Sequence, residues 1–373
     1  MPDKSAPIEA PPLAEHGASV LPSVSVDTYG AEIRDAEGFV GDRASNTAFR
    51  EILDKWRKRL KEIDEDPLAS GEKKTAKTRA KAGNGKNGQG KGEKLSKRKL
   101  DKVLAVGDPK AAGLVVSAIE EFAQELAGVI RRFLKLKAWH GTEQIVIGGG
   151  FRNSRIGEVV IGRTEVLLKA DDIDVGLTPI RHHPDEAGLL GVCHLSPAWV
   201  FTGHEGLLAV DIGGSNIRAG IVETNLKAAK DLSKAGVWKS ELWRHAETKP
   251  SRKEAVEQLG ELLRGLIREA KKNKFNLAPF IGVGCPGLIE KDGAIRRGGQ
   301  NLPGGNWESK NFNLPQALHE AVPEIGGHST AVLLHNDAVV QGLSEVPFRR
   351  EVKRWGVLTV GTGLGNARFT NRE

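Results

Sequence analysis

The sequence is poor in cysteine and in long apolar runs. Only two cysteines, Cys193 and Cys285, occur among its 373 residues. Two thiols with apolar neighbours cannot make a disulfide framework or a cysteine-based zinc site, so both are expected to be buried and inert. No apolar run approaches the roughly 18 residues of a membrane-spanning helix, and the first residues lack the basic and apolar regions of a secretory signal. These absences favour a globular protein of the reducing cytoplasm, without a membrane segment.

An excess of positive charge is also missing from most of the chain, although the net charge is +7. Residues 72–100 carry 11 Lys and Arg against two Glu, a net of +9, so the remainder is close to 7 − 9 = −2. This Gly- and Lys-rich run cannot bury enough apolar surface to fold. We interpret residues 67–100 as a basic flexible insertion, a solvated linker that makes at most weak, salt-sensitive contact with nucleic acid.

Hydrophobic periodicity indicates an α/β protein. The pattern predicts helices over residues 47–63, 111–136, 185–195 and 251–272, the last with a capping box formed by Ser251 and Glu254. It predicts strands over 144–150 and 207–212, and strand–turn units over 280–290 and 355–370. Over 330–343 it predicts a strand that leads directly into a helix. Strands that alternate with helices indicate α/β folding, with hairpins at the edges of mixed sheets.

One pattern, V-x-x-G-x-x-N-x-R, occurs twice, in AVDIGGSNIRA at 209–219 and TVGTGLGNARF at 359–369. In both places a strand, a glycine turn and a second strand are expected. Such a turn leaves several backbone N–H groups that can bind a phosphate, although most glycine hairpins only reverse the chain. Two similar turns suggest two related half-domains that clamp one polyphosphate. Asp211 then suits magnesium bound through water, and a turn-capping aspartate is the alternative.

Asp337 is the candidate general base. It follows Asn336 at the end of a predicted strand, where a carboxylate can accept the proton of a hydroxyl that attacks a phosphoryl group. An Asn-Asp pair before a helix is equally a good N-cap. Asn301 and Asn306 share a loop with Trp307. Amides beside an aromatic ring suit a polyhydroxylated ligand, and an ordinary turn loop is the alternative.

At these residues a resemblance to a known family emerges. The segments DIGGSNIRAG, IGVGCPGLI, QNLPGGNW, HNDA and GTGLGNARF resemble the ROK family of bacterial sugar kinases, within the hexokinase–actin–heat-shock ATPase superfamily. IVIGGGF at 145–151 and DEAGLLGVCHL at 185–195 resemble its adenosine-binding and last-helix segments. The resemblance covers most of residues 110–195 and 207–370. It implies two ribonuclease-H-like, actin-like lobes that close over a sugar and Mg-ATP.

The resemblance assigns a role to each matching position. Asp337 matches the general base, and Asn301, Asn306 and Asn336 match sugar-contacting positions. The remaining matches are to nucleotide-binding positions: Asp211, Gly213, Gly214, Ser215 and Asn216 in the first phosphate loop, Gly361, Thr362 and Gly363 in the second, and Gly148, Gly149 and Gly150 against the adenosine.

The order of these segments departs from the family. The family begins with the first phosphate loop and ends with the adenosine segment and last helix, whereas here those last two come first. We interpret the chain as circularly permuted, with the usual ends fused near 196–206. Residues 1–24 are then a mobile proline-rich segment, 25–200 match the family's C-terminal half, and 201–373 its N-terminal half.

The zinc motif of many family members is a second departure. Its place falls near residues 12–46, where GDRASNTAF resembles the segment that follows the motif, but no cysteine occurs there. We therefore predict no structural zinc. The family's sugar-binding glutamate has no clear counterpart near Gly41 or Asp42, and Glu15 and His16 echo its Glu and His only weakly.

Together these patterns predict a cytoplasmic, ATP- and magnesium-dependent hexose kinase, with glucose as the first candidate substrate and a homodimer as the expected assembly. Two rival hypotheses remain. A sugar-sensing regulator of the same fold needs an amino-terminal helix-turn-helix, which residues 1–46 do not show. A pseudokinase without phosphotransfer is disfavoured by the intact loops and base.

Overall fold

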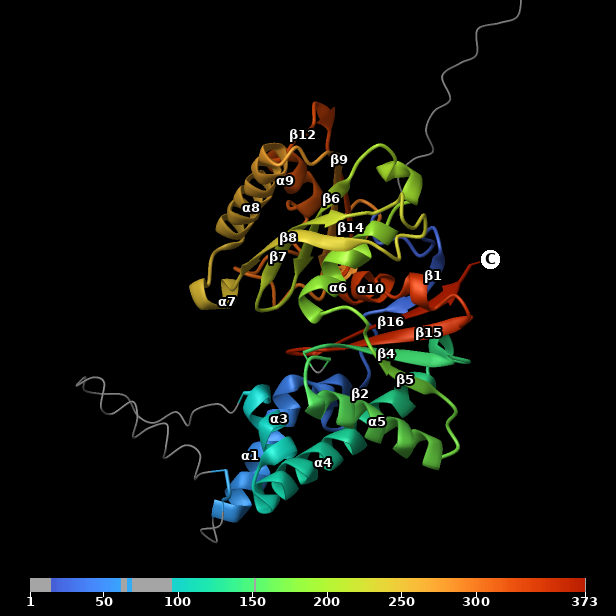
Figure 1. The fold of residues 1–373 in the computed structure, drawn as a ribbon, viewed down its shortest axis with the longest axis vertical. Helices are drawn as coiled ribbons and strands as arrows, with labels where there is room; N and C mark the ends of the chain where they lie inside the picture. Colours follow the sequence, from blue (N-terminus) through green and yellow to red (C-terminus); the bar gives the residue numbers. More distant parts are fainter. Residues whose placement is uncertain (1–14, 62–65, 69–95, 151, 373) are drawn as a thin grey trace, which may run out of the picture. The chain divides into compact units, whose positions relative to one another are not determined.

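The computed structural model describes residues 15–61, 66–68, 96–150 and 152–372, and the chain forms two compact units. Unit 1 comprises Met1–Gly30, Asp185–Lys353 and Phe369–Glu373, and unit 2 comprises Ala31–Pro184 and Arg354–Arg368. This division differs from the one into residues 25–200 and 201–373 that the order of motifs suggested. Strand β15 (Arg354–Val360) pairs in parallel with β4 (Gln144–Gly149), which places the second glycine turn in unit 2 (Figure 1).

The core of unit 1 is a five-stranded mixed sheet of order β14-β9-β6-β7-β8. Its strands are β6 (Gly206–Ile212), β7 (Ile217–Glu223), β8 (Gly236–Trp243), β9 (Leu277–Cys285) and β14 (Ala331–Asn336). Strands β14, β9 and β6 are parallel, and β6, β7 and β8 are joined antiparallel. The three parallel strands therefore end at the same edge of the sheet.

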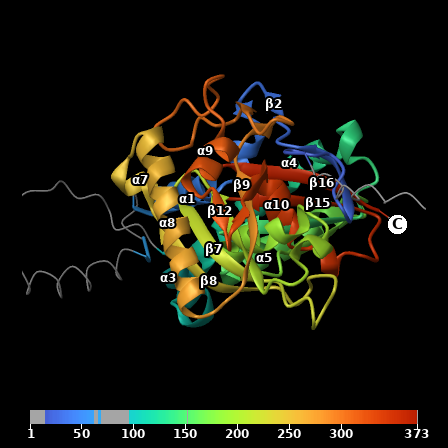
Figure 2. The same cartoon turned by 90° about the horizontal axis from the view of Figure 1, so that it is seen from above.

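Helices cover both faces of this sheet. The amphipathic helix α8 (Arg252–Lys272) and α9 (Leu314–Ala321) pack on one face, and Figure 2 shows them side by side. On the other face lie α6 (Pro184–Gly191), η3 (Val192–His194) and α10 (Asp337–Leu343). Glycines in the strands allow this approach, since a Cβ on Gly282 would lie 2.6 Å from the Cβ of Val192. The predicted capping box is present at the start of α8.

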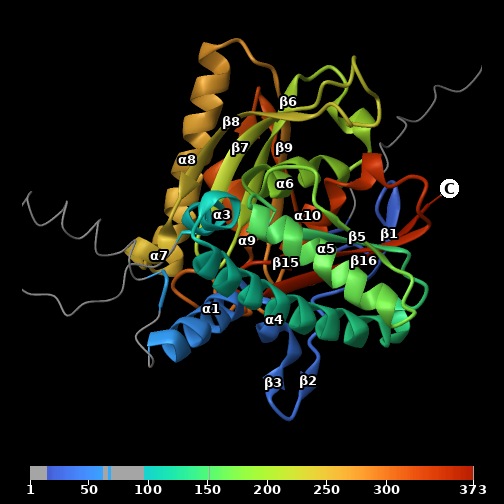
Figure 3. The ribbon, with the colours of Figure 1, turned by 60° about the horizontal axis from the view of Figure 1, so that its bottom comes forward.

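Unit 2 contributes to a second five-stranded sheet, of order β1-β16-β15-β4-β5. It contains β1 (Val24–Tyr29), β16 (Leu364–Asn371) and β5 (Gly176–Pro179) with the two strands already given. The helices α1 (Asn46–Lys61), α3 (Lys97–Val106), α4 (Pro109–Leu134) and α5 (Arg155–Ala170) pack against one another (Figure 3). Apolar side chains of α4 and α5 share one core with Ile145, Ile147 and Leu358 of the sheet.

Shorter elements complete the two units. They are β2 (Arg34–Asp35), β3 (Gly38–Phe39), η1 (Val40–Ala44), η2 (Lys137–Trp139), η4 (Ala198–Phe201), α7 (His245–Thr248), β10 (Leu288–Ile289), β11 (Ile295–Arg297), β12 (Glu324–Ile325), β13 (His328–Ser329) and η5 (Val346–Phe348). None of the helices in the described ranges is long and apolar enough to cross a membrane.

Two predicted flexible segments are partly ordered. Leu21 is buried and Val20 bridges Ser25, so the expected mobile stretch 1–24 is wrong for residues 15–24. The insertion expected over 67–100 is also too long, because Leu68 is buried and Leu100 is buried within α3. Ser96 caps α3 with its side chain, and the apolar face of the helix packs on α4. Residues 1–14 and 69–95 lie outside the described residues.

Candidate functional site

The parallel strands of unit 1 bring the predicted acids to one edge. Asp211 on β6 pairs in register with Gly284 on β9, and Asn336 on β14 pairs with Cys285. Asp337 follows directly as the first residue of α10. Rigid strands therefore position both carboxylates, which is the arrangement of ligand sites at the carboxyl ends of α/β sheets.

Asp211 lies deeper than the sequence suggested, with only 4% of its surface exposed. Its carboxylate points toward α6, where a Cβ on Gly188 would lie 2.6 Å from its Cγ. Arg218, opposite on β7, approaches Asp211 Oδ2 at 3.4 Å and also donates to Asp185 at the start of α6. Burial raises the pKa of Asp211, and the Arg218 charge opposes this rise.

Asp337 is partly buried, and no arginine of the described ranges forms an ion pair with it as Arg218 does with Asp211. Burial raises the pKa of Asp337 to about 7, and the negative charge of Asp211 adds to the rise. A general base works best when its pKa lies near the working pH. Asp337 therefore has the acid–base property that the sequence hypothesis requires.

Asn336 holds the backbone around this carboxylate. Its side-chain oxygen accepts from the N–H groups of Ala338 and Val339, at 3.0 and 3.3 Å, and caps α10. Its side-chain nitrogen donates to the Gly287 carbonyl at 3.0 Å. The capping role weighed for this residue is thus present in the structure, and its contact with a sugar stays a prediction.

The first glycine turn, residues 213–216, joins β6 to β7 beside Asp211. The Gly213 N–H donates to the Asn216 carbonyl at 2.8 Å, and the His245 ring contacts the Gly213 carbonyl oxygen at 2.9 Å. Within the described part of the chain, the N–H groups of Gly214 and Ser215 have no hydrogen-bond acceptor. These two donors can bind an anion at the sheet edge.

The asparagine loop, residues 300–307, lies against this turn. A Cβ on Gly214 would lie 3.3 Å from the Asn301 Cβ. Trp307 is buried and donates to the Pro303 carbonyl at 2.6 Å, and Gly304 takes a φ of +72° that favours glycine. Asn301 and Asn306 are exposed. The loop is anchored by its tryptophan, which leaves both amides on the surface.

In unit 2 the second glycine turn, residues 361–363, lies beside the glycines predicted to face adenosine. Thr359 pairs with Gly148 and Val360 with Gly149, and the Gly150 N–H donates to the Val360 carbonyl at 3.1 Å. Gly149 has a φ of +80°. The Gly361 N–H donates across the turn to the Gly363 carbonyl at 2.9 Å. Among the described residues, the N–H groups of Thr362 and Gly363 have no acceptor, as in the first turn.

Two residues of this second cluster were missed by the sequence reasoning. Asn46 donates from its backbone to the Gly361 carbonyl at 2.9 Å and from its side chain to the Val360 carbonyl at 3.2 Å. The Lys97 ammonium donates to Asn46 Oδ1 and to the Gly150 carbonyl, both at 2.7 Å. Burial and then the Arg50 charge lower its pKa to about 8. Lys97 belongs to the lysine-rich run at 72–100, where its composition does not distinguish it from its neighbours. Asn46 lies in the GDRASNTAF segment, which resembles a segment of the family.

The carboxylates that could help to hold a magnesium ion at the first glycine turn lie in unit 1. Among the described residues there is no group of three or more His, Cys, Asp or Glu that could hold a metal ion alone. Magnesium that is carried by nucleotide phosphates needs only one or two protein carboxylates, often through water. Asp211 and Asp185, which share Arg218, fit that requirement.

Glu15 and His16 lie along the edge of the unit 1 sheet. Glu15 forms an ion pair with Lys291 at 3.1 Å, and His16 Nδ1 accepts from the Leu334 N–H at 3.0 Å. Burial lowers the pKa of His16. Their predicted echo of the sugar-binding pair stays a weak prediction.

Comparison with known proteins gives partial matches. No family model and no curated protein sequence matches the chain. Among solved structures, a ROK hexokinase from Thermus thermophilus shares 25% identity over 36% of this chain and 35% of that one, at a TM-score of 0.26. A Listeria monocytogenes protein suggested to be an N-acetylmannosamine kinase shares 22% identity over 44% of this chain and 47% of that one, at 0.31.

The Aquifex aeolicus PPX-GPPA enzyme shares 14% identity over 62% of this chain and 83% of that one, also at a TM-score of 0.31. The chain spans only 35% and 47% of the two kinase structures. Overlays at these scores define no common overall fold.

Proposed function

We propose that the protein transfers the γ-phosphoryl group of ATP to a hexose, with glucose and its 6-hydroxyl as the first candidates and Asp337 as the general base. One observation carries the proposal. Asp337, Asp211, the first glycine turn and Asn301 meet at one sheet edge, with the pKa of Asp337 raised to about 7.

Each group has a defined task in this reaction. Asp337 accepts the hydroxyl proton as the oxygen attacks phosphorus, and phosphoryl transfer otherwise depends on positioning and charge stabilisation. The N–H groups of Gly214 and Ser215 donate to phosphate oxygens, and Thr362 and Gly363 offer the same donors in unit 2. Bound magnesium neutralises phosphate charge, and Asp211 would hold it through water.

The sugar and adenosine contacts follow from exposure and from the resemblance. The amides of Asn301 and Asn306 are exposed and available for sugar hydroxyls. Asn336 fixes the backbone next to Asp337 through its hydrogen bonds to Gly287 and Ala338. Gly149 and Gly150 offer a surface without side chains for the adenosine, whereas Gly148, which precedes them in β4, is buried.

We also propose the permuted order of the two half-domains. It is supported by the arrangement of β1 and β16, which are neighbours in the sheet although they lie far apart in the chain. The Arg372 N–H donates to the Ser23 carbonyl at 3.0 Å, and the Arg372 guanidinium donates to the Leu21 carbonyl at 2.7 Å. A hairpin in the unpermuted order would join these segments directly.

Replacement of the base tests the proposed reaction. Asp337→Asn keeps the size and capping geometry but removes the proton acceptor. We expect at least a hundredfold loss of sugar-dependent ADP release, since general-base catalysis contributes about 10²–10⁴-fold. Sugar affinity, measured by calorimetry, should change little.

Asp174→Asn, an exposed aspartate of unit 2, is the matched control and should retain full activity. Full activity in Asp337→Asn would remove the base assignment. A panel of sugars identifies the substrate, and the absence of phosphorylation across that panel, with binding retained, would favour the regulator or pseudokinase. A salt-dependent gel shift separates those two.

A further inference from the structure

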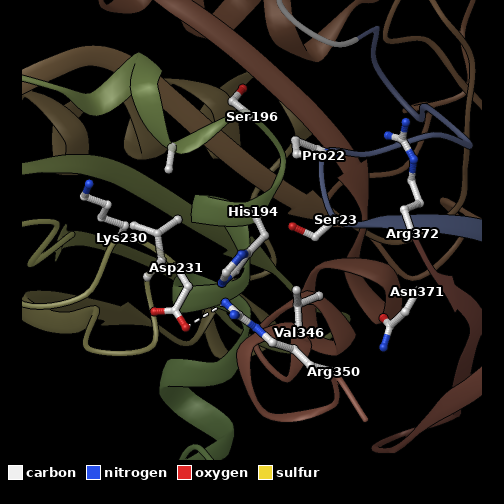
Figure 4. A pocket seen from close by; sticks show the side chains of 12 residues that line it. Pro22, Ser23, His194, Ser196, Lys230, Asp231, Val346, Arg350, Asn371 and Arg372 are labelled. Atoms are coloured by element: carbon white, nitrogen blue, oxygen red, sulfur yellow. Dashed lines mark hydrogen bonds and ion pairs between the residues drawn. The ribbon is translucent and has the colours of Figure 1, made fainter. Parts of the chain in front are cut away.

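Unit 1 contains a cavity of about 420 Å³, lined by both polar and apolar residues, that lies outside the proposed active site. Figure 4 draws its lining side chains, with Lys230 and Arg372 at opposite sides of the view and His194, Ser23, Asp231 and Arg350 between them. The latter four come from four separate segments of the chain. A volume of this size accommodates a small metabolite.

The cavity carries an excess of positive charge. Lys230, Arg350 and Arg372 contribute three cations against one acid, Asp231, which pairs with Arg350 at 2.7 Å. Neither Lys230 nor Arg372 is in an ion pair among the described residues, and the backbone of residues 21–23 fixes Arg372. The remaining charge is therefore about +2, which matches the charge of −1.5 to −2 on a phosphate monoester at neutral pH.

A buried hydroxyl in the wall points to a missing polar partner. Ser196 is 1% exposed, and within the described part of the chain its Oγ has no hydrogen-bond partner. Buried polar atoms are nearly always hydrogen-bonded, so an unpaired one needs an explanation. Because Ser196 lines the cavity, rotation of its side chain about the Cα–Cβ bond would bring this hydroxyl to a ligand oxygen there.

The cavity lies at the end of the sheet opposite to Asp211. Lys230 and Asp231 belong to the loop that follows Glu223, and Glu223 pairs with Gly206 at the start of β6. Asp211 pairs with Arg218 near the other end of the same seven-residue strand. Seven residues of strand extend about 23 Å, so a ligand here cannot reach the proposed active site.

Two helices nevertheless connect the cavity with the acids. α6 begins beside Asp185 and leads through η3 to His194, and α10 begins at Asp337 and leads through η5 to Arg350. The helices touch, because a Cβ on Gly191 would lie 1.7 Å from the Val340 carbonyl oxygen. Packed helices of this kind can transmit a small displacement.

We propose that this cavity binds a small phosphate monoester, and that its occupation alters the Asp211 and Asp337 site through α6 and α10. The first part is independent of the proposed function, and the second rests on it. Lys230 and Arg372 balance the ligand charge, and Ser196 donates a hydrogen bond to it.

Calorimetric titration with inorganic phosphate and with glycerol 3-phosphate tests the binding. Saturating ADP and magnesium are present, so that phosphate sites at the glycine turns are already occupied. We expect at least tenfold weaker binding in Lys230→Glu, whose side chain is exposed, and unchanged binding in Lys271→Glu, a matched lysine on α8. Glycerol, the neutral parent compound, should not bind.

Ser196→Ala provides a second readout that a purely structural role would not produce. Removal of an unsatisfied buried hydroxyl leaves the melting temperature unchanged or raises it, whereas the phosphate affinity should fall several-fold. Unchanged affinity in both Lys230→Glu and Ser196→Ala would overturn the binding site.

The coupling is measured as the change in sugar affinity when glycerol 3-phosphate saturates the cavity. We expect the sugar affinity to change severalfold in the wild-type protein and in Asp337→Asn. In Lys230→Glu this change should disappear. An unchanged sugar affinity would overturn the coupling while leaving the binding site. Binding of phosphate by a protein without kinase activity would instead overturn the proposed function alone.

Discussion

At the residue scale, the two acids of unit 1 differ through their neighbours. Burial raises the pKa of both, but Arg218 lies against Asp211, whereas Asp337 has the charge of Asp211 nearby. The arginine favours the ionised form of Asp211, and that charge makes ionisation of Asp337 harder. The arginine beside Asp211 therefore suits a magnesium-binding role for that carboxylate, whereas Asp337, with its pKa raised to about 7, suits the role of the base.

The pH dependence of the reaction should show this base. The pKa of Asp337 is raised to about 7, so the carboxyl is protonated and inactive below that pH. We expect kcat/KM to fall about tenfold per pH unit below pH 7. Asp211→Asn removes the neighbouring charge and should move the acidic limb to lower pH in whatever activity remains. An acidic limb near pH 4 in the wild-type protein would contradict the assignment.

Lys97 supports a second prediction at this scale. Its ammonium lies between Asn46 and Gly150 beside the second glycine turn, with its pKa lowered to about 8. A bound phosphate would favour its charged form. We expect Lys97→Met to raise the KM for ATP about tenfold and to leave the KM for sugar unchanged, because loss of a charge-assisted hydrogen bond costs roughly 1.5–3 kcal/mol.

The matched control for this change is Lys102→Met, an exposed lysine of the same helix, in steady-state kinetics with each substrate varied in turn. Equal effects of the two substitutions, or an effect on the sugar alone, would contradict a nucleotide role for Lys97.

At the element scale, the close approach of α6 to β6 depends on a glycine. A Cβ at position 188 would lie 2.6–2.9 Å from the Asp211 carboxyl group. We expect Gly188→Ala to displace this carboxylate, to lower the free energy of unfolding by about 1–3 kcal/mol as overpacking does, and to reduce kcat. Urea denaturation and kinetics measure the two effects.

The contrasting substitution is Gly162→Ala in α5, where the new Cβ meets nothing within 4 Å. It should stabilise the protein by about 0.5–1 kcal/mol through helix propensity, without an effect on kcat. If Gly188→Ala behaved like Gly162→Ala, α6 would not constrain Asp211.

Elements with strong local signals were predictable from the sequence. The apolar stripe of α4 and the capping box at Ser251 fix their helices within the segment itself. α3 was missed because its first residues share the lysine-rich composition of the preceding run, and burial of Leu100 against α4 decides its structure. Asn46 and Lys97 join the second glycine turn through contacts from distant segments, which no local pattern reveals.

At the scale of the whole molecule, each unit is built from more than one segment of the chain. Unit 2 takes β15 from the far end of the sequence, and unit 1 contains residues from both ends. A linear boundary at residue 200 cannot describe this, because strand pairing follows spatial order and not chain order. The order of motifs in the sequence indicated a rearrangement. Which unit each segment belongs to became clear only from the pairing of the strands.

The proposed permuted order makes a prediction about the molecule with its ends moved. A rearranged chain would start at His204, continue from Arg372 through a flexible linker of about twelve residues to Glu15, and end at Gly203. The opening falls in an exposed loop at Gly203, whose φ is +86°, and the linker joins segments that already share the Arg372 to Ser23 hydrogen bond.

We expect this rearranged chain to fold cooperatively, with a melting temperature within a few degrees of the original and with the proposed kinase activity unchanged. A control chain opened between Val283 and Gly284, inside the central strand β9, should not fold, because the opening breaks the ladder between β6 and β14. Loss of folding in both chains would mean that the connection through residues 196–206 is essential to the structure. The permuted interpretation would then fail, since in that interpretation this connection only joins two former ends.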